Sequence, residues 1–199
     1  MTTPTPDTLT PHTDTHSAPS HVAEATFGAG CFWCLEAAMN QLEGVIQAES
    51  GYSNGHHPRP NYEAICTGNT GHAEVVRVRF DPLRISYRQL LEVFFSLHDP
   101  TTLNRQGNDV GTQYRSGIYT HTPEQAEQAH AMIAELRTSG AHDAPIVTEV
   151  QAVTNYHPAE AYHQGYVAQH PYQGYCAVVV RPKLAKFHQT FTRLLKPAT

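Results

Sequence analysis

The 199-residue chain has little of what several large classes of protein require. No apolar run approaches the roughly 20 residues that cross a bilayer, so we do not expect a membrane protein. Lys and Arg number 13 against 18 Asp and Glu, and the net charge of −5 gives no support for a nucleic-acid partner. The start of the chain shows no basic segment followed by an apolar one, as a signal peptide has. We therefore expect a cytoplasmic protein.

Cysteine is also scarce, with four residues in the whole chain. Four are too few to act as a disulfide scaffold for a protein of this length. Without an export signal, the thiols are expected to be reactive or metal-binding groups in a reducing compartment.

The first 21 residues consist mainly of Thr, Pro, His and Ser. Such a segment cannot bury enough apolar surface to offset the entropy of ordering it, so residues 1–21 are predicted to be a disordered tail. Residues 22–199 show no internal repeat and are long enough for a single domain with its own core.

Patterns typical of strands and helices alternate along this domain. Ser86 and Gln89 have the spacing of a capping box, and Thr122 precedes a proline at a first helical position. A polar loop over 53–72 is long enough to be functional. The predicted strands cover 23–27, 45–52, 72–80, 115–122, 145–153 and 175–180. The predicted helices cover 32–43, 86–99, 158–170 and 182–195, and one further helix is predicted to begin at residue 122. This order indicates an α/β or α+β domain with a mixed sheet covered by helices.

The stretch GAGCFWCLE, residues 28–36, places Cys31 after a strand and a Gly-Ala-Gly turn, at the start of a helix. Unpaired amides and the positive end of the helix dipole stabilise an anion there, so the Cys31 thiol is expected to ionise more easily than usual. The small residues before it leave the sulfur open to a substrate. A buried structural cysteine is the alternative interpretation.

Cys34 follows three residues later, which allows a metal site or a dithiol. A zinc site usually needs two close pairs of ligands, and the other cysteines, Cys66 and Cys176, are isolated from each other. A dithiol on one helical turn fits a disulfide. However, Phe32 and Trp33 are an unusual filling for a general disulfide exchanger, and they indicate a pocket for something small and apolar.

Glu74 begins the apolar face of a predicted strand, in a row with Val76, Val78 and Phe80. A carboxyl group in such a row is desolvated, so its pKa should rise toward the range of a general acid. Alternatively, Glu74 reaches solvent at the strand end.

Two further segments offer polar side chains. The stretch RQGNDVGTQYRS, residues 105–116, presents Asp109 and Tyr114 from a loop that is either a binding loop or a solvated turn. Tyr62, within the loop 53–72, is either a hydroxyl donor or an aromatic plug.

Five segments, taken in their order along the chain, closely resemble sequence motifs of the A-type peptide methionine sulfoxide reductases. They are GCFWCLE, YEAICTGNTGHAEVV, HDPTTLNRQGNDVGTQYRS, AEAYHQGYVAQHPYQGYC and PKLAKF. The resemblance runs from about residue 24 to residue 195. It implies thiol-dependent reduction of the S epimer of methionine sulfoxide, free or in proteins, and so protein repair under oxidative stress. The implied fold is α+β, a two-layer α/β sandwich of the ferredoxin-like plait type with additional helices and strands.

The resemblance also implies a role for each candidate residue. Cys31 matches the nucleophile that attacks the sulfoxide sulfur, and Glu74 matches the acid that protonates the sulfoxide oxygen. Tyr62 and Tyr114 match hydroxyls that hydrogen-bond this oxygen.

The substrate-binding residues follow in the same way. Phe32 and Trp33 match an apolar cage for the methyl group, and Asp109 matches the anchor for the substrate's backbone or amino group.

The resolving thiol of the family matches Cys176, whereas most members have glycine where this chain has Cys34. We predict that Cys176 condenses with the sulfenic acid on Cys31, with Cys34 as an alternative resolving or relay thiol. Cys66 is interpreted as structural. Thioredoxin is the expected reductant, no metal or organic cofactor is needed, and we expect a monomer. A general thiol-disulfide oxidoreductase and a zinc-dependent binding module are the rival functions.

Overall fold

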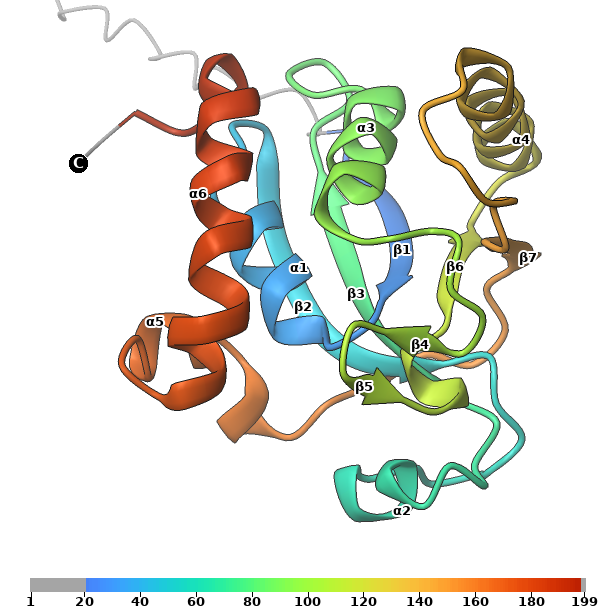
Figure 1. Cartoon of the computed structure of the whole chain (residues 1–199), viewed down its shortest axis with the longest axis vertical. Coiled ribbons are helices and arrows are strands. Elements are labelled where there is room, and N and C mark those ends of the chain that lie inside the picture. Colours follow the sequence, from blue (N-terminus) through green and yellow to red (C-terminus); the bar gives the residue numbers. More distant parts are fainter. Residues whose placement is uncertain (1–20, 198–199) are drawn as a thin grey trace, which may run out of the picture.

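A six-stranded sheet in the order β7-β6-β1-β3-β2-β8 forms the centre of the computed structural model, which describes residues 21–197 (Figure 1). Neighbouring strands are antiparallel, except that β6 and β7 are parallel. A separate two-stranded sheet pairs β4 with β5. The strands are β1 (Ala23–Ala29), β2 (Val45–Ser53), β3 (Ala73–Phe80), β4 (Arg105–Gln106), β5 (Asp109–Val110), β6 (Ser116–Thr120), β7 (Glu149–Ala152) and β8 (His157–Pro158).

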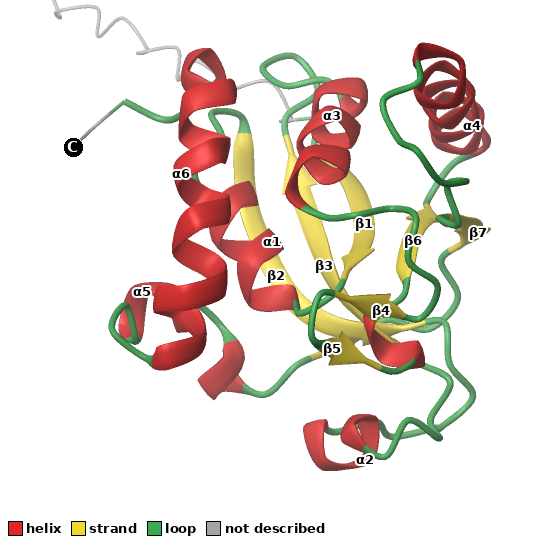
Figure 2. Cartoon of the chain, viewed as in Figure 1, coloured by secondary structure: helices red, strands yellow, loops and turns green. Residues whose placement is uncertain are grey.

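Most of the helices lie over one face of the large sheet. Figure 2 shows α1 and α3 in front of the central strands, α6 at the left beside α1, and α4 beside β6 and β7, while α2 lies beyond the end of the sheet. Together the two kinds of element make an α+β structure of two layers. The helices are α1 (Phe32–Met39), α2 (Tyr62–Cys66), α3 (Tyr87–Leu97), α4 (Pro123–Ser139), α5 (Tyr166–Gln169) and α6 (Arg181–Thr190).

The topology confirms the ferredoxin-like plait. In chain order, β1, α1, β2, β3, α3 and β6 alternate as a βαββαβ unit, and their strands lie in the order β6-β1-β3-β2. Each helix therefore crosses over one intervening strand, so that β1 and β3 become neighbours at the centre of the sheet. The short strands β4, β5, β7 and β8 are additions to this unit.

The main core fills the space between the sheet and these helices. Phe27 of β1 stacks on Phe94 of α3 with ring centroids 5.1 Å apart. Both side chains are fully buried, so truncating Phe94 to alanine is expected to cost about 3–5 kcal/mol of stability. Ser86 caps α3, and Ser86 and Gln89 form the predicted capping box.

The predicted core-facing row of β3 is confirmed. Val76, Val78 and Phe80 are at most 2% exposed, and Glu74 at the head of the row is also 2% exposed. The carboxyl group of Glu74 therefore lies inside the protein and does not reach solvent.

The predicted strand over 175–180 is wrong. Cys176–Val180 is a π-helical turn that continues directly into α6. Cys176 and Val180 are buried four residues apart while Val178 is 75% exposed, which is a helical and not an alternating pattern. A short apolar run does not distinguish these states by sequence.

The predicted helix over 158–170 is broken in the structure. It consists of a 3₁₀ turn, Ala161–His163, and the short helix α5, separated by Gly165. Gly165 has a φ of +63°, a left-handed conformation that interrupts a helix and favours glycine.

Other bounds also differ from the predictions. The strand predicted over 145–153 is the shorter β7, and the helix predicted over 182–195 ends at Thr190. The first helix ends at Met39, four residues before Glu43, and the polar loop 53–72 contains helix α2. Asn61 caps α2 by accepting a hydrogen bond from the amide of Ala64 at 2.8 Å.

The predicted disordered tail, residues 1–21, lies outside the described residues except for His21. Within the part of the chain that the structure describes, no helix has the length and apolar character that crossing a membrane requires.

Candidate active site

The thiol of Cys31 lies where the two central strands bring distant segments together. Because β1 and β3 are antiparallel, the end of β1 meets the beginning of β3, which carries Glu74. Gly30 turns the chain from β1 into α1 with a φ of +81°. A Cβ atom there would lie 2.6 Å from the side chain of Gln106, so only glycine fits. Cys31 is thereby held as the residue that precedes α1.

Glu74 accepts a hydrogen bond from the first amide of α1. The N–H of Phe32 donates to Oε2 of Glu74 at 3.2 Å. Burial raises the pKa of Glu74 to about 8, the Phe32 amide opposes this shift, and the nearby charge of Asp109 adds to it. The carboxyl group is therefore largely protonated at neutral pH and can donate a proton.

The Cys31 thiol does not ionise as easily as its position before a helix led us to expect. Burial raises its pKa well above the ordinary value, and the neighbouring Glu74 raises it further. The amide of Trp33 and the hydroxyl of Tyr175 act in the opposite direction. Desolvation outweighs the helix terminus here, so the thiol is neutral when the site is free.

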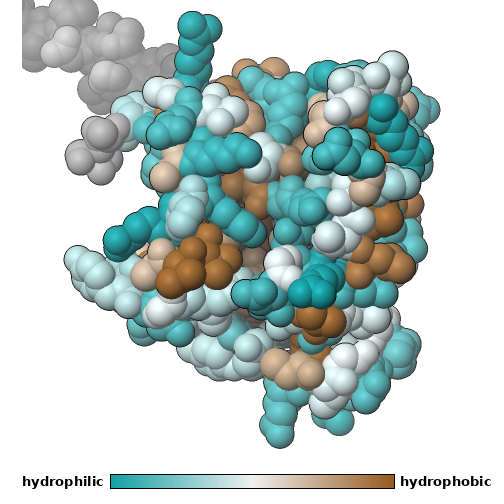
Figure 3. Space-filling view, viewed as in Figure 1, coloured by the Kyte–Doolittle hydropathy of each residue, from teal (hydrophilic) through white to brown (hydrophobic). Residues whose placement is uncertain are grey.

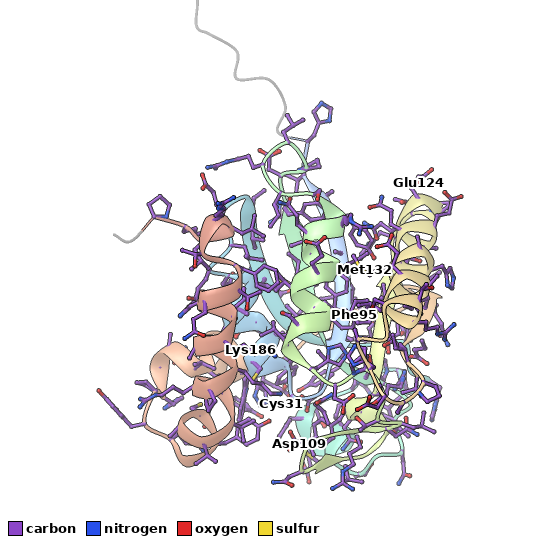
Figure 4. The ribbon with its side chains drawn as sticks, turned by 45° about the horizontal axis from the view of Figure 1, so that its top comes forward. Cys31, Phe95, Asp109, Glu124, Met132 and Lys186 are labelled. Atoms are coloured by element: carbon purple, nitrogen blue, oxygen red, sulfur yellow. The ribbon has the colours of Figure 1, made fainter. Side chains whose placement is uncertain are left out.

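A cavity of about 130 Å³ opens onto the sulfur of Cys31. Figure 4 labels Cys31 and Asp109, which lie close to each other at one end of the sheet. The structure brings together all the candidate residues except Cys34 and Cys176, and it adds Tyr175. The residues that line the cavity are Cys31, Phe32, Trp33, Tyr62, Glu74, Asp109, Tyr114 and Tyr175.

Two tyrosines, Tyr62 and Tyr114, line this cavity. Burial raises the pKa of both Tyr62 and Tyr114, so each keeps its proton and can donate a hydrogen bond. Tyr62 begins α2, and its amide donates to Oε1 of Glu160 at 2.8 Å. Tyr114 lies in a 3₁₀ turn, Thr112–Tyr114, just before β6.

The aromatic wall of the cavity is supported from the carboxy-terminal third of the chain. Trp33 stacks on Tyr166, and its Nε1–H donates to Nδ1 of His163 at 3.2 Å. The His163 ring also packs against Phe32 and Tyr62, with centroids 5.1 and 4.6 Å away. Sequence reasoning missed both supporting residues, although they lie in the stretch AEAYHQGYVAQHPYQGYC.

Glu36 attaches the same segment to α1. Its side chain is 2% exposed, and its Oε1 accepts a hydrogen bond from the amide of Gly165 at 2.9 Å. Burial raises the pKa of Glu36 to about 7, and the Gly165 amide opposes the shift. Glu36 was not among the predicted site residues, although it closes the GCFWCLE motif.

The carboxylate of Asp109, the predicted anchor for the substrate, is already hydrogen-bonded in this structure. The hydroxyl of Tyr175 donates to its Oδ2 at 2.7 Å. Tyr175 thus connects the predicted anchor with the sulfur of Cys31, whose pKa it lowers. Its position directly before Cys176 is the signal that could have identified it.

The remaining cysteines occupy two different environments. Cys34 and Cys176 are 5% and 2% exposed and pack in one cluster with Val180. Burial raises the pKa of Cys34 to about 11. Cys66 is exposed at the end of α2.

Candidate metal ligands were sought around these thiols. Among residues 21–197, no three His, Cys, Asp or Glu side chains converge in a way that could hold a metal ion.

The plait, with a thiol and a buried acid in one cavity, has the architecture of a two-layer α+β enzyme. Residues 23–195 match the family model described as peptide methionine sulfoxide reductase. The peptide methionine sulfoxide reductase MsrA of Polynucleobacter asymbioticus is 56% identical over 173 residues, which are 87% of this chain and 91% of the relative. The chain belongs to the peptide methionine sulfoxide reductase family.

Solved structures of the family share the fold. Reduced Mxr1 from Saccharomyces cerevisiae superposes with a TM-score of 0.72 at 32% identity, covering 82% of this chain and 93% of that one. Methionine sulfoxide reductase A of Corynebacterium diphtheriae has a TM-score of 0.70 at 35% identity, covering 80% and 79%.

Proposed function

We propose that this chain reduces the S epimer of methionine sulfoxide, free or within proteins, and so repairs oxidised methionine under oxidative stress. The observation that carries the proposal is one small cavity that holds the Cys31 thiol beside the protonated carboxyl of Glu74. A nucleophile and a proton donor at one point are what cleavage of a sulfur–oxygen bond needs.

The first half of the reaction transfers oxygen from substrate to enzyme. The sulfur of Cys31 bonds to the sulfoxide sulfur while Glu74 gives its proton to the sulfoxide oxygen. Glu74 then takes up the proton of the thiol, so the carboxyl group returns to its starting state. The hydroxyl group then passes from the substrate sulfur to the sulfur of Cys31 as the bond between the two sulfurs breaks, which leaves a sulfenic acid on Cys31 and releases methionine.

The cavity walls orient the substrate for this step. The hydroxyls of Tyr62 and Tyr114 donate to the sulfoxide oxygen, where negative charge develops. Phe32 and Trp33 enclose the methyl group, and Asp109 with Tyr175 accepts the amino side of the substrate.

The second half uses the other buried thiols. Cys34 lies on α1 one helical turn from Cys31 and packs beside Cys176. The Cys34 thiol attacks the sulfenic acid and water leaves, which forms a Cys31–Cys34 disulfide. Cys176 then attacks Cys34, so Cys31 becomes a free thiol again and the oxidation resides in a Cys34–Cys176 disulfide. Cys176 is thus the final resolving thiol and Cys34 the relay.

A dithiol protein is the natural reductant of such a disulfide, because exchange through a mixed disulfide returns both thiols. Yeast Mxr1 has been solved in complex with Trx2. We extend that partnership to this chain and name thioredoxin as its reductant.

The test is thioredoxin-coupled NADPH oxidation with the separated S and R epimers of a methionine sulfoxide peptide. We expect turnover of the S epimer alone and its loss in Cys31→Ser. Cys66→Ser, which changes an exposed thiol, serves as the matched control and should retain activity. Failure to turn over either epimer, combined with reduction of insulin, would instead identify a general disulfide oxidoreductase.

A further inference from the structure

A second and larger cavity, of about 510 Å³, lies next to the reaction cavity. It is bounded by the end of α3, the loop after α4 and the exposed side of α6. Figure 3 shows that polar side chains dominate this face of the molecule and that apolar ones form only small patches. The lining of the cavity includes the charged side chains of Asp99, Asp143, Lys183 and Lys186.

A third space shares lining residues with both cavities. This space, of about 190 Å³, is lined by Cys31 and Asp109, which also line the reaction cavity, and by Gln106 and Lys183. Gln106 and Lys183 also line the larger cavity. A chain that enters the reaction cavity with its methionine sulfoxide side chain can therefore continue along this path.

The wall between the two cavities is rigid. Gln106 is 8% exposed, and its amide group makes two hydrogen bonds to the backbone of Asp99. Its Nε2 donates to the carbonyl of Asp99 at 3.0 Å, and its Oε1 accepts from the Asp99 amide at 3.1 Å.

Lys183 and Lys186 supply the positive charge of the larger cavity. They are three residues apart on α6, which places them on one face of the helix. Figure 4 shows Lys186 on α6 above Cys31 in that view. Neither lysine forms a salt bridge with another described residue, whereas Arg77, Arg84 and Arg115 each pair with a glutamate.

Two carboxylates, Asp99 and Asp143, line the same cavity, but neither forms a salt bridge with Lys183 or Lys186 among the described residues. Oδ1 of Asp99 already accepts two hydrogen bonds from Thr101, and Asp143 is exposed on the loop after α4. Burial lowers the pKa of His98 to about 4, so its ring is neutral. Both ring nitrogens of His98 are also hydrogen-bonded.

We propose that this cavity is a subsite for a carboxylate side chain, Asp or Glu, that flanks the oxidised methionine in a polypeptide substrate. Lys183 and Lys186 bind the carboxylate, and the segment between it and the methionine sulfoxide follows the path past Gln106. The proposal rests on the proposed function and specifies its substrates. The reaction cavity alone holds only the end of a side chain, so the rest of a polypeptide has to lie outside it.

The test compares pairs of peptides that each contain one S-sulfoxide and differ only by Glu or Gln. The variable residue is placed in turn at each of the three positions before and after the sulfoxide. Both peptide ends are blocked, so that no terminal carboxylate competes. At low ionic strength we expect kcat/KM to be about 5–10-fold higher for Glu than for Gln at one or two positions on one side. The ratio should fall as salt is added.

Two lysine variants identify the recognising groups. Lys186→Gln should bring the Glu/Gln ratio close to 1, and Lys186→Glu should favour a peptide with Lys at the same position. Ratios are taken within one variant, so a general loss of activity cancels. Lys196→Gln is the matched control, since the Lys196 amine donates to the carbonyl of Asn40 away from the cavity. This control should keep the wild-type ratio.

The possible failures are distinguishable. A ratio of 1 at all positions in the active wild-type enzyme, or an unchanged ratio in both Lys186 variants, would refute the subsite alone. No turnover of any sulfoxide peptide would refute the proposed function and the subsite with it.

Discussion

The indole ring of Trp33 lies parallel to the ring of Tyr166, with centroids 3.8 Å apart and an interplanar angle of 5°. Trp33 is the single tryptophan of the chain. Its stacking partner follows Gly165, whose amide is bound by Glu36 of the same helix that carries Trp33. Trp33 and Glu36, one helical turn apart on α1, therefore both hold the segment Gly165–Tyr166. The fluorescence of Trp33 should respond to any change in this arrangement.

Glu36→Ala is expected to loosen the wall of the reaction cavity. The amide of Gly165 loses its acceptor in a largely buried place, which costs about 1–3 kcal/mol. Tryptophan emission should shift to longer wavelength and become easier to quench with iodide, and KM should rise more than kcat falls. Glu36→Gln keeps an acceptor oxygen and should restore both properties, whereas Glu127→Ala on the exposed side of α4 is the matched control. A variant whose emission and KM equal those of the wild type would show that the contact is dispensable.

Glu74→Gln should slow the oxygen-transfer step by about 10²–10⁴-fold, because the amide cannot donate a proton as an acid does. Single-turnover release of methionine isolates this step from reduction by thioredoxin. Its rate in the wild type should be constant at low pH and fall as pH rises through about 8, where the carboxyl group loses its proton. The variant should lack this fall. Glu63→Gln, an exposed change on α2, should keep the wild-type profile.

The same carboxyl group should also make the stability of the folded protein depend on pH. The pKa of Glu74 is about 8 in the folded protein and about 4.3 in an unfolded chain, so the folded state binds the additional proton. The wild type should therefore lose stability relative to Glu74→Gln as pH rises from about 4 to 8. Urea unfolding at pH 5 and pH 9 measures this difference. An equal gap between the two proteins at both pH values would contradict the raised pKa.

Tyr175→Phe should make the Cys31 thiol harder to ionise, because the hydroxyl of Tyr175 lowers its pKa. The rate of alkylation by iodoacetamide can be followed against pH in a background of Cys34→Ser, Cys66→Ser and Cys176→Ser, which leaves one thiol. The midpoint should move to higher pH with Tyr175→Phe. Tyr172→Phe removes a hydroxyl from an exposed ring and should leave the midpoint where it is.

Disulfide mapping after one turnover without reductant tests the order of the three thiols. The wild type should carry a Cys34–Cys176 disulfide, and Cys176→Ser should stop at Cys31–Cys34. In Cys34→Ser, the sulfenic acid on Cys31 should persist long enough for capture by dimedone. A Cys31–Cys176 disulfide in the wild type would show that the relay is bypassed and that Cys176 resolves the sulfenic acid directly.

Much of the reactive centre could be predicted from the sequence, because its residues lie in regular elements with clear periodicity. Alternation along β3 places Glu74 in the core, and the Gly-Ala-Gly turn places Cys31 before a helix. The pKa of Cys31 could not be predicted this way, since it depends on burial and on Glu74, which is 43 residues away in the sequence. The local sequence pattern indicates the helix terminus, which lowers the pKa of Cys31, but not the burial that raises this pKa.

The carboxy-terminal third was harder to predict because its chain is held by contacts and not by periodic elements. Gly165 breaks an apparently continuous helix, and an apolar run beside Cys176 forms a π-helical turn where a strand was predicted. Glu36, His163 and Tyr166 act on the site through partners about 130 residues away in the sequence. No local spacing reveals such pairs.

The thiols lie in two structurally separate parts of the protein. Cys31 and Glu74 are held by the central strands, whereas Cys176 belongs to a turn outside the sheet that leads into α6 and packs beside Cys34 of α1. Loss of Cys176 alone would leave the oxygen-transferring machinery intact and convert a catalyst into a reagent used once per molecule, until some small thiol regenerates it. The plait can therefore retain the proposed oxygen-transfer step while changes in a few residues near the end of the chain alter how the enzyme is reduced.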